Sequence, residues 1–365
     1  MMNKRILILT AQKGGGHRSS SDAVEKAILA LNQNADIISF DALELMPGYN
    51  GDEKGYVLLT TRYRVVWKLF FELTSLFSGV SNFFLHKTIE RRFKDIIDRY
   101  QPDIILTLHP CFVGSVQMCL KKMRLSIPVL TCIVDLVKHT RLWHDKRSAA
   151  TFVPTARMRD VLLKKGFKPE RVIHTGFPVK EAYLHCIKNL KADGLTPDVL
   201  MINPSMRGNK AALMFIRSIL AFRVNLTVVT GQNTGMKTYL DKNLKGEPSV
   251  TILGYVTDMA ERMARADIII TKAGPNLLME AVAMGVPIII TGHIPGQEEK
   301  NHAYIVENHY GLKAESPCLL RDALGLLLKE NRRLMRDISE NQRRCTDTRG
   351  AEAIAAWLSN HTESL

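Results

Sequence analysis

The segment 271–302 combines a glycine turn with polar side chains that could bind a phosphorylated ligand. The apolar run Asp267–Ile270 predicts a buried strand, Gly274-Pro275 predicts a turn, and the apolar spacing that follows predicts a helix ending at Gly285. Backbone N–H groups and the dipole at the start of such a helix suit a diphosphate. Glu280 follows one to two turns into this helix, where its carboxylate could accept hydrogen bonds from ribose hydroxyls.

A glycine turn before a helix occurs in any doubly wound α/β unit, so the turn alone is weak evidence for a site. The next predicted strand, Ile288–Thr291, is followed by Pro295-Gly296 and then by the polar cluster Gln297–Asn301. A purely structural loop does not need so many polar side chains. We therefore interpret the whole segment as a binding site.

A second glycine turn follows a short apolar strand near the N-terminus, where Ile6–Leu9 leads to Gly14–Gly16 and His17. Glycines remove side chains where another molecule must approach the backbone closely. Lys4-Arg5 before an apolar run also suits a secretory signal, but this run has only about six residues and Gln12-Lys13 ends it. His17 is expected at a helix start at the mouth of a parallel sheet, where ligands bind in such folds.

Two further strands are predicted to end at polar residues in the middle of the chain. Ile104–Leu108 precedes His109-Pro110, and Pro128–Val134 precedes Asp135, with Trp143 after it. His109 is equally compatible with a functional role and with that of a hydrogen-bonded strand-end histidine.

These four segments resemble the signatures of the glycosyltransferase family that contains the monogalactosyldiacylglycerol synthases and the processive diacylglycerol glucosyltransferases. The loop P-G-Q-E-x-x-N, here Pro295–Asn301, is the most discriminating part, and the resemblance covers about residues 5–315. It implies an α/β fold of the GT-B type, with two Rossmann-like doubly wound domains facing a cleft. The expected domains are an acceptor- and membrane-binding domain at 1–180, a UDP-sugar-binding domain at 195–340 and a C-terminal helix at 341–365 that could pack back on the first.

The resemblance implies inverting transfer of galactose or glucose from a UDP-sugar to 1,2-diacylglycerol, without a cofactor or metal ion. His17 would be the catalytic base. The implied donor-binding residues are Ser205, Arg207, Tyr255, Val256, Gly274, Pro275, Asn276, Glu280, Gln297, Glu298 and Asn301. The acceptor-site candidates are Gly15, Gly16, His109 and Asp135.

The chain departs from the family pattern in two places. The loop 201–210 lacks the usual glycine-rich form, although Arg207 could still bind a diphosphate by charge. His139 lies one position earlier than the corresponding histidine of relatives, which leaves its role in doubt.

Two other functions stay open at this point. A transferase of the same architecture could act on a polyprenyl-diphosphate intermediate of the cell wall, although such enzymes normally lack both the G-G-G-H and the P-G-Q-E-x-x-N forms. A non-catalytic nucleotide-sugar or lipid-binding protein is the alternative from another class, and it would leave His17 and Glu280 expendable.

Composition restricts the partners. The formal net charge of +14 calls for an anionic partner, and no recognisable nucleic-acid-binding module is present. The six cysteines lack metal-ligand spacing and suit a reducing compartment, and no D-x-D triplet marks a metal–nucleotide site.

Residues 56–94 concentrate nine of the 25 aromatic residues together with seven Lys or Arg against two acids. Their apolar side chains recur at helical spacing, which is typical of a helix in a membrane interface with cations on anionic headgroups. The predicted membrane contacts are Arg62, Tyr63, Arg64, Trp67, Lys68, Phe70 and Phe71. We expect a peripheral protein on the cytoplasmic side of the cell membrane; the alternative is a pair of core helices divided at Gly79.

Overall fold

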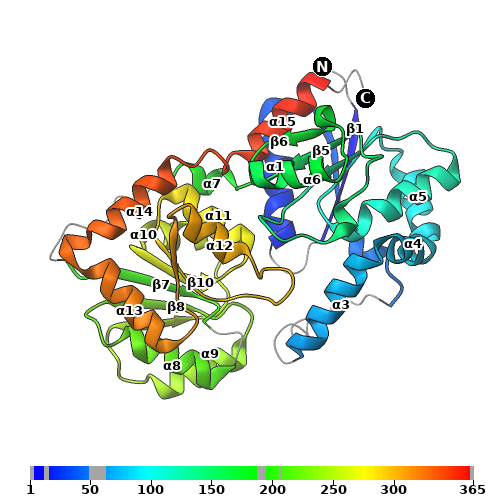
Figure 1. Ribbon diagram of the computed structural model, residues 1–365. Helices are drawn as coiled ribbons and strands as arrows, with labels where there is room; N and C mark the ends of the chain where they lie inside the picture. The colour runs from blue at the N-terminus through cyan, green and yellow to red at the C-terminus, as the bar shows by residue number, and fades with distance from the viewer. Residues whose placement is uncertain (1–3, 12–15, 49–62, 187–194, 205–207, 362–365) are drawn as a thin grey trace. The chain divides into compact units, whose positions relative to one another are not determined.

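The computed structural model describes residues 4–11, 16–48, 63–186, 195–204 and 208–361 (Figure 1). The chain forms two compact units. The first comprises Met1–Leu59, Val65–Lys180 and Thr346–Leu365, and the second comprises Thr60–Arg64 and Glu181–Cys345. Each described unit is built around one parallel sheet of six strands.

The first sheet has the strand order β2-β1-β3-β4-β5-β6, and all its neighbouring strands are parallel. Its strands are β1 (Arg5–Thr10), β2 (Asp36–Asp41), β3 (Ile104–Thr107), β4 (Val129–Cys132), β5 (Ala150–Val153) and β6 (Val172–His174). Because β1 pairs with both β2 and β3, the chain reverses its direction of winding between β1 and β3. Ligands bind at such a switch point, beyond the carboxyl ends of the strands.

Helices cover both faces of this sheet. The described helices of this unit are α1 (Gly16–Leu31), α3 (Arg64–Leu76), α4 (Ser78–Tyr100), α5 (Gly114–Met123), α6 (Ala156–Lys164) and α15 (Gly350–His361), with the 3-10 turns η1 (Ala42–Leu45), η2 (Pro110–Phe112), η3 (Arg141–Trp143) and η4 (Pro169–Arg171). Helix α3 extends away from the sheet (Figure 1). Phe93 of α4 packs with Leu7 and Ile105 of the strands in a fully buried core.

The C-terminal helix α15 belongs to the first unit and packs against α1. At the start of α15, the backbone passes very close to the segment after β6. A Cβ on Gly350 would lie 2.2 Å from the carbonyl oxygen of Gly176. At the same place, Nε2 of His174 lies 2.9 Å from Oδ1 of Asp347, and the Phe177 N–H donates to the Asp347 carbonyl at 2.6 Å. Glycine is therefore required where the chain returns to this unit.

The second sheet has the strand order β12-β11-β10-β7-β8-β9, again all parallel. Its strands are β7 (Asp198–Ile202), β8 (Asn225–Val229), β9 (Val250–Leu253), β10 (Ile268–Lys272), β11 (Ile288–Gly292) and β12 (Gly311–Lys313). Here the switch point lies between β7 and β10. The carboxyl ends of these two strands are therefore the expected place for a ligand.

Around this sheet lie α7 (Glu181–Leu184), α8 (Asn209–Ile219), α9 (Thr234–Asn243), α10 (Met259–Arg265), α11 (Pro275–Met284), α12 (Asn301–Glu307), α13 (Pro317–Leu328), η5 (Glu330–Arg332) and α14 (Arg333–Arg343). Helices α8, α9 and α13 share one core on the same face of the sheet, as Figure 1 shows. The predicted turn and helix of 274–285 are present: Pro275 opens α11, and Gly285 ends it with a left-handed φ of 72°.

The aromatic segment forms two helices, but they divide at Phe77 and not at Gly79, which lies inside α4. No residue of α3 is buried, whereas α4 buries His86, Ile89, Phe93 and Ile97. The core alternative therefore holds only for the second half of α4. Within the described part of the chain, no helix has both the length and the apolar character needed to cross a bilayer.

Candidate active site

Two histidines meet at the switch point of the first sheet. His17 lies in the first turn of α1 directly after the β1 loop, and His109 follows β3 and caps η2. Their ring centroids are 4.8 Å apart, with an angle of 56° between the planes. The fold thus brings the predicted base and a predicted acceptor-site residue side by side.

The hydrogen bonds of His17 define which of its nitrogens can act as a base. Nδ1 lies 2.7 Å from the carbonyl oxygen of Leu108, and a carbonyl can only accept, so Nδ1 carries the proton. Burial lowers the pKa of His17 below its ordinary value, and the bond to Leu108 opposes this effect only in part. A neutral ring with its proton on Nδ1 leaves a lone pair on Nε2, as a general base requires.

His109 has the opposite arrangement of protons. The backbone N–H of Cys111 donates to its Nδ1 at 3.4 Å, so the neutral ring carries its proton on Nε2. Burial, and next the nearby His17, hold the pKa of His109 well below its ordinary value. His109 is therefore a strand-end histidine that caps η2, and its Nε2–H is a donor close to the predicted base. Its contact with an acceptor stays a prediction.

The other acceptor-site candidates lie nearby or outside the described residues. The carboxylate of Asp135 is buried in the loop after β4 and accepts a 2.8 Å hydrogen bond from the indole N–H of Trp143. The η3 turn that contains Trp143 packs against η2, beside His109. Asp135 thus fixes this loop, and its contact with an acceptor stays a prediction. Gly16 opens α1, and Gly15 falls outside the described residues.

His139 and His144 pair within that same loop, with their Nε2 atoms 2.7 Å apart. Burial is the largest cause that lowers both pKa values, and together with His139 and nearby cations it lowers the pKa of His144 to about 4. Because each imidazole uses its Nε2 to contact the other, this geometry gives His139 a structural role in holding the loop.

In the second unit, the predicted phosphate turn and the P-G-Q-E loop lie side by side. Lys272, the last residue of β10, donates to Glu298 Oε1 at 2.6 Å, and the Ile294 N–H donates to Glu298 Oε2 at 2.8 Å. The side-chain amide of Asn301 donates to the carbonyl of Ala273 at 2.9 Å. These bonds join the loop after β11 to the turn before α11.

Glu298 and Asn301 therefore hold the site together in this structure. Their direct contact with a sugar stays a prediction. Sequence reasoning missed Lys272, although its position next to the A-G-P turn in T-K-A-G-P was a usable signal.

Most remaining donor-site candidates lie along the carboxyl edge of the second sheet. Gly274 and Pro275 begin α11 after β10, together with Asn276, and half-buried Gln297 lies in the loop after β11. Exposed Tyr255 and half-buried Val256 follow β9, at the opposite end of the edge. Ser205 and Arg207, after β7, fall outside the described residues.

Glu280 lies one turn and a half into α11 and is only 6% exposed. Helix α7 packs against α11, and burial together with the nearby charge of Glu280 raises the pKa of Tyr183. A carboxylate at such a depth needs hydrogen-bond partners. Contact between the Glu280 carboxylate and a ribose stays a prediction.

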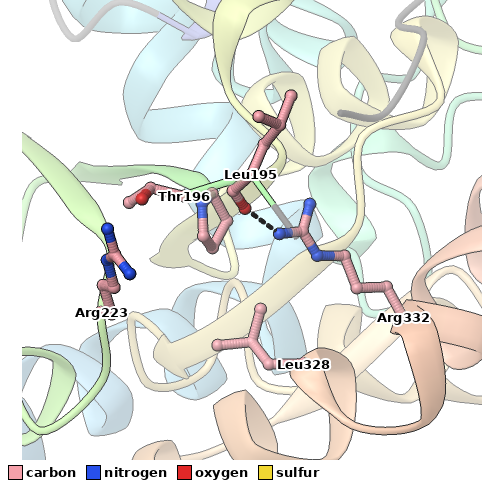
Figure 2. Close-up of a pocket in the computed structure, with 6 residues that line it drawn as sticks. Leu195, Thr196, Arg223, Leu328 and Arg332 are labelled. Atoms are coloured by element: carbon pink, nitrogen blue, oxygen red, sulfur yellow. Dashed lines mark hydrogen bonds between the residues drawn. The ribbon is translucent and has the colours of Figure 1, made fainter. Parts of the chain in front are cut away.

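A hollow of about 200 Å³ in the second unit lies away from this edge (Figure 2). It lies at the start of β7, where the guanidinium of Arg332 donates to the Leu195 carbonyl. Its lining residues are Leu195, Thr196, Pro197, Arg223, Leu328 and Arg332. Ligands of parallel α/β sheets bind at the carboxyl ends of the strands, so this hollow is separate from the candidate site.

Comparison with known structures identifies the fold. MurG of Acinetobacter baumannii aligns with a TM-score of 0.60 at 14% identity, covering 98% of this chain and 99% of that one. UGT71G1 of Medicago truncatula, solved with UDP-glucose, aligns with a TM-score of 0.63 at 11% identity, covering 98% of each chain. The predicted GT-B fold is confirmed.

Comparison of sequences identifies the family. Residues 17–179 match the family model of monogalactosyldiacylglycerol synthase, and residues 202–353 match the C-terminal domain of glycosyltransferase family 28. Probable monogalactosyldiacylglycerol synthase 2 of Oryza sativa subsp. indica is 28% identical, covering 86% of this chain and 71% of its own. Monogalactosyldiacylglycerol synthase 1 of Arabidopsis thaliana is 29% identical, over 86% of this chain and 63% of its own. With both halves matched in order, the chain belongs to the glycosyltransferase family that contains the monogalactosyldiacylglycerol synthases.

Proposed function

We propose that this glycosyltransferase moves galactose from UDP-galactose to the free hydroxyl of 1,2-diacylglycerol. The observation that carries the proposal is the neutral His17 beside His109, at the switch point of the unit that matches the synthase model. The names of the relatives favour galactose over glucose. The product would be a β-glycosyldiacylglycerol, because a single in-line displacement inverts the anomeric centre.

The chemistry follows from the protonation states of the two histidines. The lipid hydroxyl oxygen attacks the anomeric carbon while the bond from that carbon to the diphosphate oxygen breaks. His17 Nε2 takes the hydroxyl proton, and UDP leaves with the electron pair. The Nε2–H of His109 is a donor that can hold the attacking oxygen in place.

In the second unit, the strand order suggests how UDP-galactose would lie. Along the carboxyl edge, the strands follow in the order β9-β8-β7-β10-β11. The loop after β9 therefore comes first, the loops after β7 and β10 come next, and the loop after β11 comes last. We assign them to uracil, diphosphate and hexose, respectively. Glu280 of α11 would then hold the ribose, and Gln297 the hexose.

Glu280→Ala is expected to weaken UDP binding by about 10- to 100-fold, since removing one partner of a buried hydrogen bond costs roughly 1–3 kcal/mol. Isothermal titration calorimetry with UDP measures this loss. Glu247→Ala, at an exposed glutamate of the same unit, is the matched control and should bind UDP normally. Wild-type affinity in Glu280→Ala, with an unchanged melting temperature, would show that the ribose lies elsewhere.

Activity is expected to survive an excess of EDTA. We assign neutralisation of the departing diphosphate to the start of α11 and to the Lys272 ammonium, which lies at the end of β10. Initial rates with EDTA and with added manganese or magnesium test this prediction. Complete loss in EDTA that a divalent cation restores would contradict it.

We further propose that the protein lies peripherally on the cytoplasmic face of an anionic membrane through α3 and the first turns of α4. Val66, Phe70 and Leu73 are each more than 40% exposed on α3, and Val80 and Phe84 on α4. Tyr63 and Lys68 are exposed as well, whereas Arg64, Trp67 and Phe71 are half-buried; Arg62 falls outside the described residues. A surface of this kind would place the first unit where diacylglycerol resides.

The proposed function is tested by measuring UDP release from purified protein with UDP-galactose or UDP-glucose. Each donor is offered with diacylglycerol, with a polyprenyl diphosphate intermediate, and with no acceptor. Release that requires diacylglycerol and is fastest with UDP-galactose supports the proposal. Release that requires the polyprenyl diphosphate favours the cell-wall alternative, and binding of UDP-galactose without any release favours a non-catalytic binding protein.

A further inference from the structure

A histidine and a glutamate pair beyond the carboxyl ends of β11 and β12. These strands are parallel neighbours, and His293 follows β11 directly, while Glu315 lies two residues after β12. His293 Nδ1 lies 2.8 Å from Glu315 Oε1, and Lys313 Nζ lies 3.1 Å from Glu315 Oε2. Glu315 thus contacts both neighbours, through a hydrogen bond with His293 and an ion pair with Lys313.

This chain of contacts fixes the tautomer of His293. Burial raises the pKa of Glu315, but its hydrogen bonds from Lys313 and His293 outweigh burial and lower that pKa overall. An ionised carboxylate only accepts, so Nδ1 of His293 carries the proton. In the neutral form of the ring, Nε2 is then an acceptor, and the described hydrogen bond of the ring is the one from Nδ1 to Glu315.

The pair also lies at one end of the candidate donor site. His293 and His302 bracket the P-G-Q-E loop, and their ring centroids are 6.1 Å apart, so the two ends of the loop meet. In the strand order of this sheet, β11 lies on the side of the phosphate turn opposite to β9. If uracil lies after β9, the hexose lies toward β11 and His293.

We propose that His293 accepts a hydrogen bond at Nε2 from a hydroxyl group of the donor hexose, with Glu315 as a positioning residue that fixes the ring. The proposal rests on the proposed function, since it takes the donor to be a UDP-hexose. The partly exposed ion pair of Lys313 with Glu315 adds little to stability, which favours a role for Glu315 in orienting the imidazole over one in folding.

Calorimetry with UDP and with UDP-galactose on the full chain tests the proposal. His293→Phe keeps a ring but removes both nitrogens, and it should weaken UDP-galactose about 5- to 10-fold, the value of one hydrogen bond to a neutral group, without changing UDP binding. Glu315→Leu should weaken UDP-galactose in the same selective way. Glu315→Gln, which retains an oxygen that can accept from Nδ1, should lose less than Glu315→Leu.

The matched control is His185→Phe, at an exposed histidine of the same unit that also pairs with a glutamate, Glu181, at 3.3 Å. It should bind both ligands like wild type. Unchanged UDP-galactose binding in His293→Phe, or equal losses for UDP and UDP-galactose, would overturn the proposal while leaving the UDP-sugar site intact. Wild-type protein that binds neither ligand would overturn the proposed function and this inference together.

Discussion

His17→Ala is expected to lower the turnover number by about 10²- to 10⁴-fold, the usual contribution of a general base. The substitution removes Nε2, whose lone pair takes the proton from the lipid hydroxyl, and it leaves the second unit unchanged. UDP affinity should therefore equal that of wild type, and circular dichroism should show a folded protein. Turnover within a few-fold of wild type would remove His17 from the mechanism.

The lowered pKa of His17 leads to a related prediction about the pH dependence of the reaction. Burial holds its pKa below 6.5, and the ring acts as a base only when it is deprotonated. In wild type, kcat/KM should therefore stay level as the pH falls from about 8 to about 6.5, and decline only at lower pH. A decline centred above pH 6.5 that His17→Ala abolishes would contradict the assigned environment of the ring.

Leu69→Asp combined with Phe70→Asp is expected to release the protein from anionic liposomes, with a loss of affinity of about 10²-fold or more. The two side chains are 59% and 57% exposed on α3, so their replacement costs no core packing. Each apolar side chain that enters the membrane interface contributes roughly 1.5–3 kcal/mol. Co-sedimentation with liposomes measures the loss.

The matched control places the same two charges on exposed leucines of the second unit. Leu319 and Leu326 of α13 are 52% and 53% exposed, and Leu319→Asp with Leu326→Asp should leave liposome binding unchanged. UDP affinity should be intact in both double variants. Retained liposome binding in the α3 variant, or equal release of both variants, would show that α3 is not the membrane contact.

Local chemistry explains which parts of the fold the sequence could predict. Gly274-Pro275 and Gly285 act through neighbouring backbone atoms, and the structure starts and ends α11 at these residues. The division of the aromatic segment at Phe77, and the absence of any buried residue from α3, depend instead on what packs against these helices. Sequence periodicity describes one face of a helix but not its neighbour.

The candidate site shows the same difference. The glycine turn predicts the position of His17 at the mouth of the first sheet, and the family resemblance implies its role as a base. Its proton position depends on the Leu108 carbonyl, a backbone atom that any residue would provide. The Lys272–Glu298 pair joins two segments that only the strand order of the second sheet brings together. Such contacts between distant segments follow from tertiary structure, and a single sequence does not encode them in a readable pattern.

Identification of the lipid product tests the central claim most directly. Purified protein is incubated with UDP-galactose and diacylglycerol, and the organic extract is analysed by mass spectrometry and proton NMR. The account predicts a hexosyldiacylglycerol whose anomeric proton has the large coupling of a β-galactoside, and about 10²- to 10⁴-fold slower formation of this product by His17→Ala. An α-linked product, or free hexose and UDP without a glycolipid, would contradict it.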